Sequence, residues 1–193
     1  IIANYCSLND IHYIHASTIL VHGFRNKFFS NKISYNPDTE YGKSKLVGDL
    51  NIMKSNCFYS ILRFSGIYGF SGPEHLGINV SIKNALNDKK PILYGNGLAK
   101  RNYIFVDDAA RIILRLIKKK KKGIFYIGGE TVTFKQMFRD IYNFWFPRTK
   151  IIKRKLKNKT HDQLSIISKN FSFYTSFRNS LKKINKKKLK NVQ

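Results

Sequence analysis

Hydrophobic positions along the chain follow two periods, and the switch between them predicts strands separated by helices. Short apolar runs bounded by turn residues are typical of buried strands, whereas apolar residues three and four positions apart are typical of amphipathic helices. We expect strands at 11–18, 58–64, 92–94, 103–106 and 124–127. We expect helices at about 39–54, near 79–87, from 107 to the lysine run at 118–122, at 133–146, and from about 175 onward. Strands that alternate with helices favour an α/β fold with a largely parallel sheet.

Local signals mark the ends of several of these helices. Asp107 and Asp108 suit a helix N-terminus, where a carboxylate satisfies free backbone N–H groups. The run from Thr133 to Gln136 is a capping-box pattern, and Thr175 or Ser176 can cap the final helix. The apolar residues expected on the inner faces of the fourth and last helices are Ile112, Ile113, Leu116, Ile117, Phe177, Leu181 and Ile184, with Leu189 off the stripe.

Composition is that of a globular protein with a large excess of positive charge. Hydrophobic residues make up 42% of the 193 positions, and 36 Lys and Arg against 11 acidic residues give a formal charge of +25. Such a charge favours anionic partners. Lys, Asn, Ile and Phe, however, all have A/T-rich codons, and the excess is concentrated at 118–122 and from 150 onward, where charge runs usually form a solvated face.

A basic nucleic-acid-binding module is therefore the weaker of the readings that charge allows. It would use the region 150–190, with Phe171, Phe173 and Tyr174 as stacking platforms for bases. Those aromatic residues more simply pack against the terminal helix. We therefore expect no nucleic-acid partner.

Other features of the composition concern the compartment and the chain's extent. Cys6 and Cys57 form no C-x-x-C pair, which fits a reducing cytoplasm, and the five histidines lack metal-ligand spacing. No apolar run reaches the roughly 18 residues of a membrane span. An apolar pattern is already under way at Ile1, so we expect a further segment upstream.

Tyr41 and Lys45 are the first candidates for chemistry. They lie four residues apart on the expected helix, and hence on one face, one turn apart. An ammonium near a phenol favours the phenolate and lowers its pKa toward physiological pH, as a tyrosine that acts as general acid and base requires. The spacing alone is a weak signal in a chain so rich in basic residues.

Four segments in order give this pair a context. Ser17 to Gly23 begin at the end of the first strand, Tyr41 and Lys45 follow a linker, and the segments 63–69 and 97–108 come later. Together they resemble the extended short-chain dehydrogenase/reductases, the NAD-dependent epimerases and dehydratases of nucleotide sugars. The resemblance covers about 11–146 and implies a partial doubly wound (Rossmann-like) parallel sheet with a smaller C-terminal α/β substrate-binding region.

The resemblance implies a mechanism of transient oxidation with NAD or NADP. Tyr41 is then the catalytic acid and base, Lys45 holds the nicotinamide ribose and lowers the pKa of the tyrosine, and Thr18 hydrogen-bonds the reacting sugar oxygen. A 4-keto sugar forms and is then epimerised, dehydrated or reduced. Taken alone, Thr18 is equally a strand-end hydroxyl that caps backbone.

It also implies binding residues for the cofactor and for a nucleotide-sugar substrate. Ser17 and Ser65 join Tyr41 and Lys45 at the cofactor, Gly66 lies at the substrate, and Arg101 holds the nucleotide phosphates. Taken alone, Arg101 is equally a solvated surface arginine. The resemblance also allows a homodimer through the Tyr41 helix region.

Departures from the family's pattern affect the reaction and the substrate. His22 stands where the family usually has Tyr, Gly66 where it often has an Asn that contacts substrate, and Asn102 where Asp is common. The dehydratases typically carry acidic residues directly after the catalytic Thr. Here those positions are Ile19 and Leu20, which cannot transfer protons, so an epimerase or ketone reductase is favoured.

The glycines at 66, 69 and 72 imitate a nucleotide-binding loop. Such a loop must run straight into a helix, whereas Pro73 and Gly77 interrupt one here, so we assign these glycines to a substrate loop.

The family's glycine fingerprint would lie further upstream than this chain extends. We therefore expect 1–72 to be the second half of the cofactor domain and 73–193 to be mainly the substrate-binding region, interleaved with it. An inactive fragment or pseudoenzyme of the same descent is the alternative.

Overall fold

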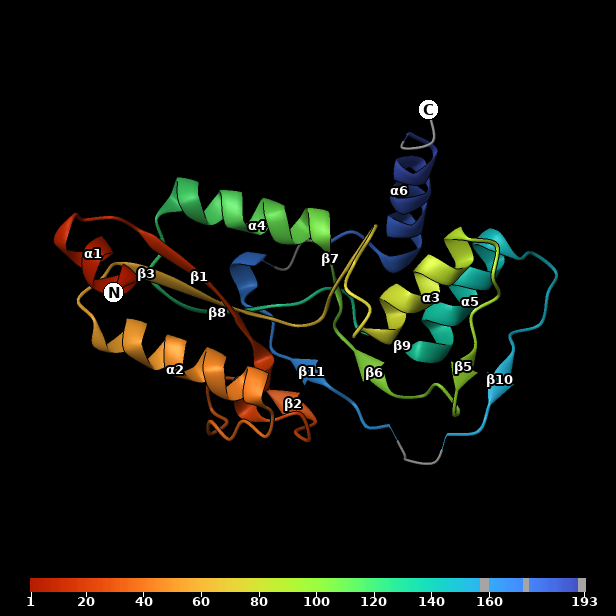
Figure 1. Cartoon of the computed structure of the whole chain (residues 1–193), viewed down its shortest axis with the longest axis horizontal. Helices are drawn as coiled ribbons and strands as arrows, with labels where there is room; N and C mark the ends of the chain where they lie inside the picture. Colours follow the sequence, from red (N-terminus) through yellow and green to blue (C-terminus); the bar gives the residue numbers. More distant parts are fainter. Residues whose placement is uncertain (157–159, 172–173, 191–193) are drawn as a thin grey trace.

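A three-stranded parallel sheet forms the centre of the chain. The computed structural model describes residues 1–156, 160–171 and 174–190. Strands β1 (Tyr13–Thr18), β3 (Tyr59–Phe64) and β8 (Gly123–Ile127) lie in the order β1-β3-β8. Helix α2 (Glu40–Lys54) covers one face of this sheet and α4 (Val106–Lys119) covers the other (Figure 1). The expected Rossmann-like α/β arrangement is confirmed.

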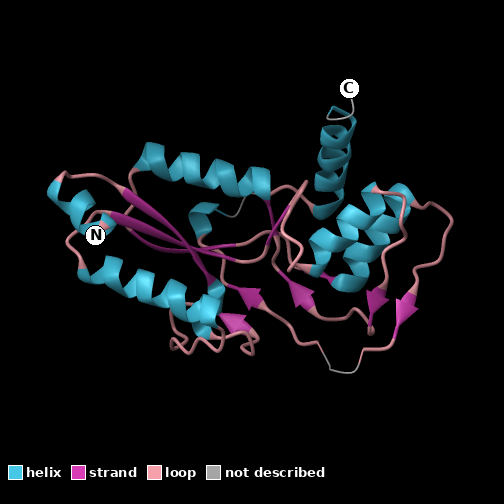
Figure 2. Cartoon of the chain, viewed as in Figure 1, coloured by secondary structure: helices cyan, strands magenta, loops and turns pink. Residues whose placement is uncertain are grey.

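A second group of elements lies beside the sheet, where helices pack together above short strands (Figure 2). Its helices are α3 (Gly77–Leu86), α5 (Phe134–Trp145) and α6 (Phe177–Lys190). The shorter elements of the whole chain, some beside the central sheet and some in the second group, are α1 (Ile2–Leu8), η1 (Ile19–His22), β2 (Phe28–Phe29), β4 (Ile67–Tyr68), β5 (Leu93–Tyr94), β6 (Lys100–Arg101), β7 (Ile104–Phe105), β9 (Val132–Thr133), β10 (Lys153–Arg154), β11 (Leu164–Ser165) and η2 (Lys169–Phe171). The pairs β10-β5, β11-β2 and β4-β7 are parallel, and β6-β9 is antiparallel.

Two apolar clusters hold these groups together. Between the sheet and α4, the fully buried side chains include Leu62, Ile112, Leu116 and Ile127. The second cluster joins α3, α5 and α6, with Ile78, Met137, Ile141, Leu181 and Ile184 among its members. At about 1.5–3 kcal/mol for each buried aliphatic side chain, these clusters are the main source of stability.

Some expected helix details are confirmed and others are wrong. Thr133 caps α5 by accepting from the Gln136 N–H at 3.1 Å, although the Gln136 side chain donates to Asp140 and so leaves the capping box half formed. Ile117 is 52% exposed, because it is the residue directly after Leu116 and so points away from the face of α4 that buries Ile112 and Leu116. Leu189 is exposed, as expected.

The acidic pair at the start of α4 does not cap that helix. The helix begins one residue before the pair, at Val106, and its N-terminus has no side-chain cap. Asp108 is fully buried and instead accepts from the backbone N–H and the hydroxyl of Thr175, the latter at 3.0 Å. This carboxylate therefore fastens the segment before α6 to α4.

Cys6 and Cys57 are both buried and free. Within the described residues, no helix combines the length and apolar character that crossing a membrane requires. The same residues contain no group of three or more His, Cys, Asp or Glu side chains placed to hold a metal ion.

Candidate active site

The carboxyl ends of the three strands bring small polar residues to one edge of the sheet. The register of β1 and β3 places Ser17 opposite Arg63 and Thr18 opposite Phe64, so Ser65 follows directly at the same edge. The Ser65 N–H donates to the Ile127 carbonyl at 2.8 Å, which ties this edge to β8. In open α/β sheets this edge is where ligands bind.

Two of these hydroxyls are buried without a partner among the described residues. They are the hydroxyls of Ser17, which is 4% exposed, and of Ser65, which is 6% exposed. An unsatisfied buried hydroxyl costs roughly 1–3 kcal/mol, so a partner from outside the chain would stabilise both. Thr18 accepts from the Leu20 N–H at 3.2 Å and so caps η1, but its own hydroxyl proton remains to be donated.

Helix α2 brings Lys45 to this edge and places Tyr41 beside Lys45. Thr39 caps the helix by accepting from the Gly42 N–H at 3.0 Å, which places Tyr41 in the first turn. The Lys45 ammonium donates to the Ala16 carbonyl, near the end of β1, at 3.0 Å. It also lies 5.8 Å from the centre of the Tyr41 ring. The pair expected from the sequence is therefore brought together.

The expected lowering of the Tyr41 pKa is not found. Partial burial raises the pKa of the Tyr41 phenol above its ordinary value of 10.0. The Lys45 ammonium donates to the Ala16 carbonyl, and burial is the cause of the raised pKa of Tyr41. The phenol is therefore protonated at physiological pH in this structure.

Gly42 allows α2 to lie close to η1. A Cβ atom at this position would be 2.7 Å from the Leu20 carbonyl oxygen and 3.1 Å from the Pro37 and Thr39 side chains. Real Cβ atoms do not approach backbone oxygen so closely, and the carbonyl cannot rotate away as a side chain can. The glycine beside Tyr41 is thus required for the packing of the helix that carries the pair.

Replacing Gly42 by Ala should therefore destabilise the chain by about 1–3 kcal/mol, the cost of overpacking. Thermal unfolding followed by circular dichroism should show this as a lowered Tm. Gly77→Ala is the matched control, because a Cβ atom at this first residue of α3 would meet nothing within 4 Å. Equal losses in the two variants would contradict the close approach at Gly42.

The expected substrate residue Gly66 is covered by an aromatic ring. A Cβ atom there would lie 2.6 Å from two ring carbons of Tyr103. The Tyr103 ring therefore fills the space that a side chain at position 66 would take. The Gly66 carbonyl accepts from the Ile104 N–H at 2.9 Å, which joins β4 to β7.

Arg101 is held by backbone and is not a solvated surface arginine. It is 7% exposed, and one terminal nitrogen donates to the Lys100 carbonyl at 2.8 Å and to the His161 carbonyl at 2.6 Å. Its guanidinium lies 5.0 Å from the centre of the Phe134 ring. The described contacts place it on β6, in the second group of elements, and not against Tyr41 or Lys45.

A buried polar network beneath α2 was missed from the sequence. Asp49 and Arg63 are both fully buried, and the Nε and Nη2 atoms of Arg63 donate to one Asp49 oxygen at 3.2 and 3.1 Å. The Nη1 atom donates to the Tyr126 hydroxyl at 2.8 Å, and the Tyr35 ring covers the guanidinium at 4.7 Å. The signal that could have indicated it is an acidic residue, Asp49, two turns after Tyr41 on the same face of the helix.

His22, which differs from the family's usual Tyr, belongs to this network. Its Nδ1 lies 3.1 Å from the Ser34 carbonyl and its Nε2 lies 2.8 Å from the Tyr126 hydroxyl. A carbonyl only accepts, so Nδ1 carries the proton and Nε2 accepts from Tyr126. Burial lowers the pKa of His22, which keeps this ring neutral.

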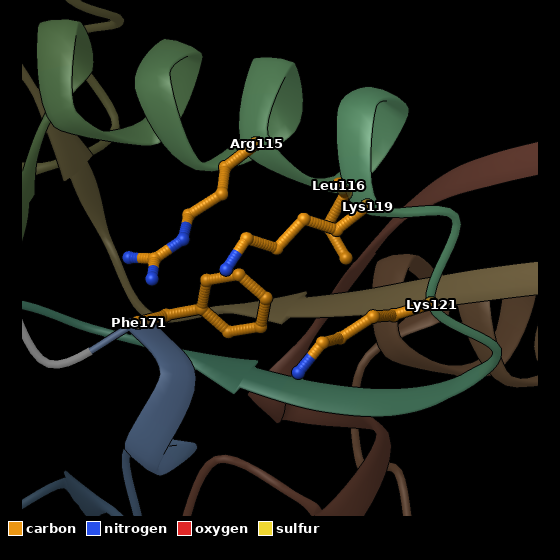
Figure 3. A pocket seen from close by; sticks show the side chains of 5 residues that line it. All are labelled: Arg115, Leu116, Lys119, Lys121 and Phe171. Carbon is orange, nitrogen blue, oxygen red and sulfur yellow. The ribbon is translucent and has the colours of Figure 1, made fainter.

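Of the aromatic residues considered as platforms for bases, Phe171 is buried whereas Tyr174 is 44% exposed. Phe171 is 1% exposed, and Figure 3 shows its ring inside the fold below α4, with Arg115, Lys119 and Lys121 around it. The cavity there measures about 10 Å³, space for about one water molecule. We expected Phe171 to pack against the terminal helix. It packs instead against the sheet and α4. Phe173 lies outside the described residues.

The glycine-containing loop after β3 does not run into a helix. It first forms β4, and α3 begins only at Gly77. The side chain of Asn79 fills the loop, accepting from the Gly69 N–H at 3.3 Å and donating to the Pro73 carbonyl at 3.1 Å. This agrees with a loop that is shaped by its own side chains and not by a phosphate.

Comparison with known sequences identifies relatives of this arrangement. The profile of the family described as "NAD dependent epimerase/dehydratase family" matches residues 1–128. A putative UDP-glucose 4-epimerase of Methanocaldococcus jannaschii is 30% identical over 110 residues, which are 53% of this chain and 36% of that protein. A probable dTDP-glucose 4,6-dehydratase of Sinorhizobium fredii is 33% identical over 132 residues, which are 60% of this chain and 35% of that protein.

Solved structures share the fold over nearly the whole chain. UDP-glucuronic acid 4-epimerase from Bacillus cereus, in complex with NAD, superimposes with a TM-score of 0.79 at 21% identity, covering 99% of this chain and 66% of that one. At this identity the likeness shows the fold alone. The chain spans about a third of the length of the curated relatives it matches and two thirds of the structural ones.

Proposed function

The chain belongs to the NAD dependent epimerase/dehydratase family, and from that premise we propose that it carries the catalytic part of an enzyme that epimerises or reduces a nucleotide sugar through a transient 4-keto sugar. One observation carries the proposal. Lys45 reaches the sheet edge at which the buried hydroxyls of Ser17 and Ser65 lack partners, and Tyr41 lies beside Lys45. This edge offers an acid and base group beside unsatisfied hydrogen-bonding groups.

NAD or NADP fits these residues as the cofactor. The unpartnered hydroxyls of Ser17 and Ser65 and the Lys45 ammonium would hold its nicotinamide end. When bound, the nicotinamide supplies a site that accepts a hydride and returns it. Solved relatives that share the fold carry NAD in their complexes, which supports the choice of cofactor class.

Tyr41 would move the proton that accompanies the oxidation. As the phenolate it takes the proton from the sugar hydroxyl, and as the phenol it returns a proton to the ketone oxygen. The Thr18 hydroxyl, whose proton is not used by the capping of η1, would donate to the same sugar oxygen. The raised pKa of Tyr41 leaves the resting phenol protonated, the form that donates to a ketone.

The residues after Thr18 favour epimerisation or ketone reduction over dehydration. Dehydration needs groups that remove and deliver further protons, and Ile19 and Leu20 in η1 cannot do so. Names of both kinds, epimerase and dehydratase, occur among the relatives.

The substrate would be a nucleotide sugar, and Arg101 remains the residue proposed for its phosphates. A homodimer through α2 also stays a prediction, tested by the particle mass in ultracentrifugation.

A catalytically inactive member of the family is the second candidate. The observation that favours it is the Tyr41 phenol, whose pKa is raised where a catalyst needs it lowered. In that case the fold and the pairing of Tyr41 with Lys45 persist without turnover.

A panel assay separates the two candidates. The protein at its natural length would be incubated with NAD⁺ or NADP⁺ and with UDP- and dTDP-linked hexoses, and the products would be read by NMR. We expect inversion or reduction at C4 of at least one sugar. No conversion of any sugar by a protein that binds the cofactor would contradict the proposal and favour the inactive member. Loss of water from the sugar would contradict the preference for epimerase or reductase.

A further inference from the structure

The helix that carries Tyr41 and Lys45 has unusually little apolar anchorage. Its buried residues are Gly42, Asp49 and Ile52, so Ile52 is the one large apolar side chain of α2 that is fully enclosed. Gly42 fixes how close the first turn of α2 lies to η1. Most α-helices are positioned by an apolar stripe, whereas in α2 Leu46 and Leu50 are only partly buried and a charged residue, Asp49, is fully buried between them.

That charged residue lies in line with the pair. Tyr41, Lys45 and Asp49 follow one another at four-residue intervals and so form one stripe along α2. Asp49 receives two hydrogen bonds from Arg63, and Arg63 precedes Ser65 by two residues along β3. The ion pair thus links the stripe of α2 directly to the strand whose end carries a proposed cofactor-binding hydroxyl.

The Arg63 guanidinium is fixed from several sides. Its Nη1 atom donates to Tyr126 on β8, and the Tyr35 ring stacks over it. The remaining Asp49 oxygen faces the His15 Nε2 atom of β1 at 3.6 Å. Arg63 of β3 therefore holds the Asp49 carboxylate through hydrogen bonds, and Tyr126 of β8 holds Arg63 in turn, whereas His15 lies near the carboxylate without a hydrogen bond to it.

A buried ion pair is weak as a source of stability but strong as a constraint on geometry. Replacing such a pair with apolar side chains of similar volume is often neutral or stabilising. A misplacement of about 1 Å near a reacting group, in contrast, costs up to about 10²-fold in rate. The pair is therefore better explained by the placement of α2 than by the stability of the fold.

We propose that Asp49 and Arg63 are positioning residues, a buried ion pair that fixes the rotation and height of α2 so that Tyr41 and Lys45 meet the ends of β1 and β3. The proposal rests on the proposed function of Tyr41 for its consequence in catalysis, but not for its geometry. It assigns to Arg63 a role that involves no contact with substrate.

The test follows the Tyr41 phenol by NMR in protein labelled at the tyrosine ring carbon that bears the hydroxyl, with Tyr41→Phe used to assign the signal. The variants are Asp49→Asn and the double variant Asp49→Leu with Arg63→Met, which keeps the site filled. We expect both to lower the Tyr41 pKa toward about 10, because a helix free to rotate exposes the phenol. The double variant should keep its Tm near that of the wild type, and kcat should fall by about 10- to 100-fold with a smaller change in KM.

Asp108→Asn is the matched control, because Asp108 is also fully buried but fastens the segment before α6 and not α2. It should lower Tm without moving the Tyr41 titration. A wild-type Tyr41 titration in the folded double variant would overturn the proposal, as would the same shift in Asp108→Asn. The titration needs no substrate, so it is independent of whether Tyr41 is catalytic. If Asp49→Asn fails to fold, the double variant carries the test.

Discussion

Tyr41→Phe should abolish turnover while the protein stays folded. The substitution removes one hydroxyl from a side chain that is 54% exposed, so packing changes little. It removes the only proposed group that can carry the proton between the sugar hydroxyl and the ketone, and loss of such a group costs roughly 10² to 10⁴ in kcat. Steady-state kinetics on the protein at its natural length measure this directly.

Two controls isolate the role of the hydroxyl. Tyr94→Phe removes a hydroxyl from a tyrosine that is 50% exposed on β5, and should keep kcat. Lys45→Ala should weaken cofactor binding, because the ammonium at the end of β1 is lost. A Tyr41→Phe protein with the wild-type kcat would remove Tyr41 from the mechanism.

The 193-residue chain by itself should bind NAD⁺ and NADP⁺ no more tightly than about 1 mM, equivalent to about −4.1 kcal/mol. A dinucleotide's pyrophosphate is normally held by N–H groups at a helix N-terminus that follows a strand and a glycine turn. Among the described residues, the glycines after β3 lead to β4, those after β8 lead to β9, and β1 leads only to the single turn η1. The cofactor-binding residues proposed in this chain, Ser17, Lys45 and Ser65, would contact the nicotinamide end alone.

The open edge of β1 should also weaken dinucleotide binding by this chain, because it favours association between chains. This strand lies at the edge of the three-stranded sheet, so a row of its backbone groups is open to pairing with other chains. Calorimetric titration of the purified chain with each dinucleotide decides the question. Micromolar binding by a soluble monomer would contradict the expectation and require the loop at 66–72 to be reconsidered as a phosphate site.

The larger elements followed from periodicity because each combines a local pattern with a buried partner. The strands at 58–64 and 124–127 and the helix with Thr39 at its start were predicted closely, since apolar runs and caps are local signals. Among the two-residue strands, β5 and β7 were predicted from the apolar residues at 92–94 and 103–106, whereas β6 and β9 were missed because two residues carry no period. Helix α1 was also missed, and its Ile2, Tyr5 and Leu8 side chains are exposed, without an inner stripe to reveal it.

Features of the candidate site were likewise predictable where they depend on local spacing, and not where they depend on tertiary contacts. The pairing of Tyr41 with Lys45 depends on helical spacing and was predictable, whereas the direction of the Tyr41 pKa depends on burial and on where the Lys45 ammonium points. The bond between Asp49 and Arg63 joins residues on different elements. No local pattern encodes it, although a lone carboxylate on the inner face of a helix requires such a partner.

Transfer of deuterium from the sugar to the cofactor tests most directly whether the sugar is transiently oxidised at C4. The protein at its natural length, loaded with NAD⁺ or NADP⁺, would be mixed with a converted nucleotide sugar that carries deuterium at C4, quenched during turnover, and analysed by mass spectrometry. We expect deuterium on the nicotinamide ring of part of the cofactor, and none in the Tyr41→Phe protein. Conversion of the sugar with no deuterium on the cofactor at any time would contradict it.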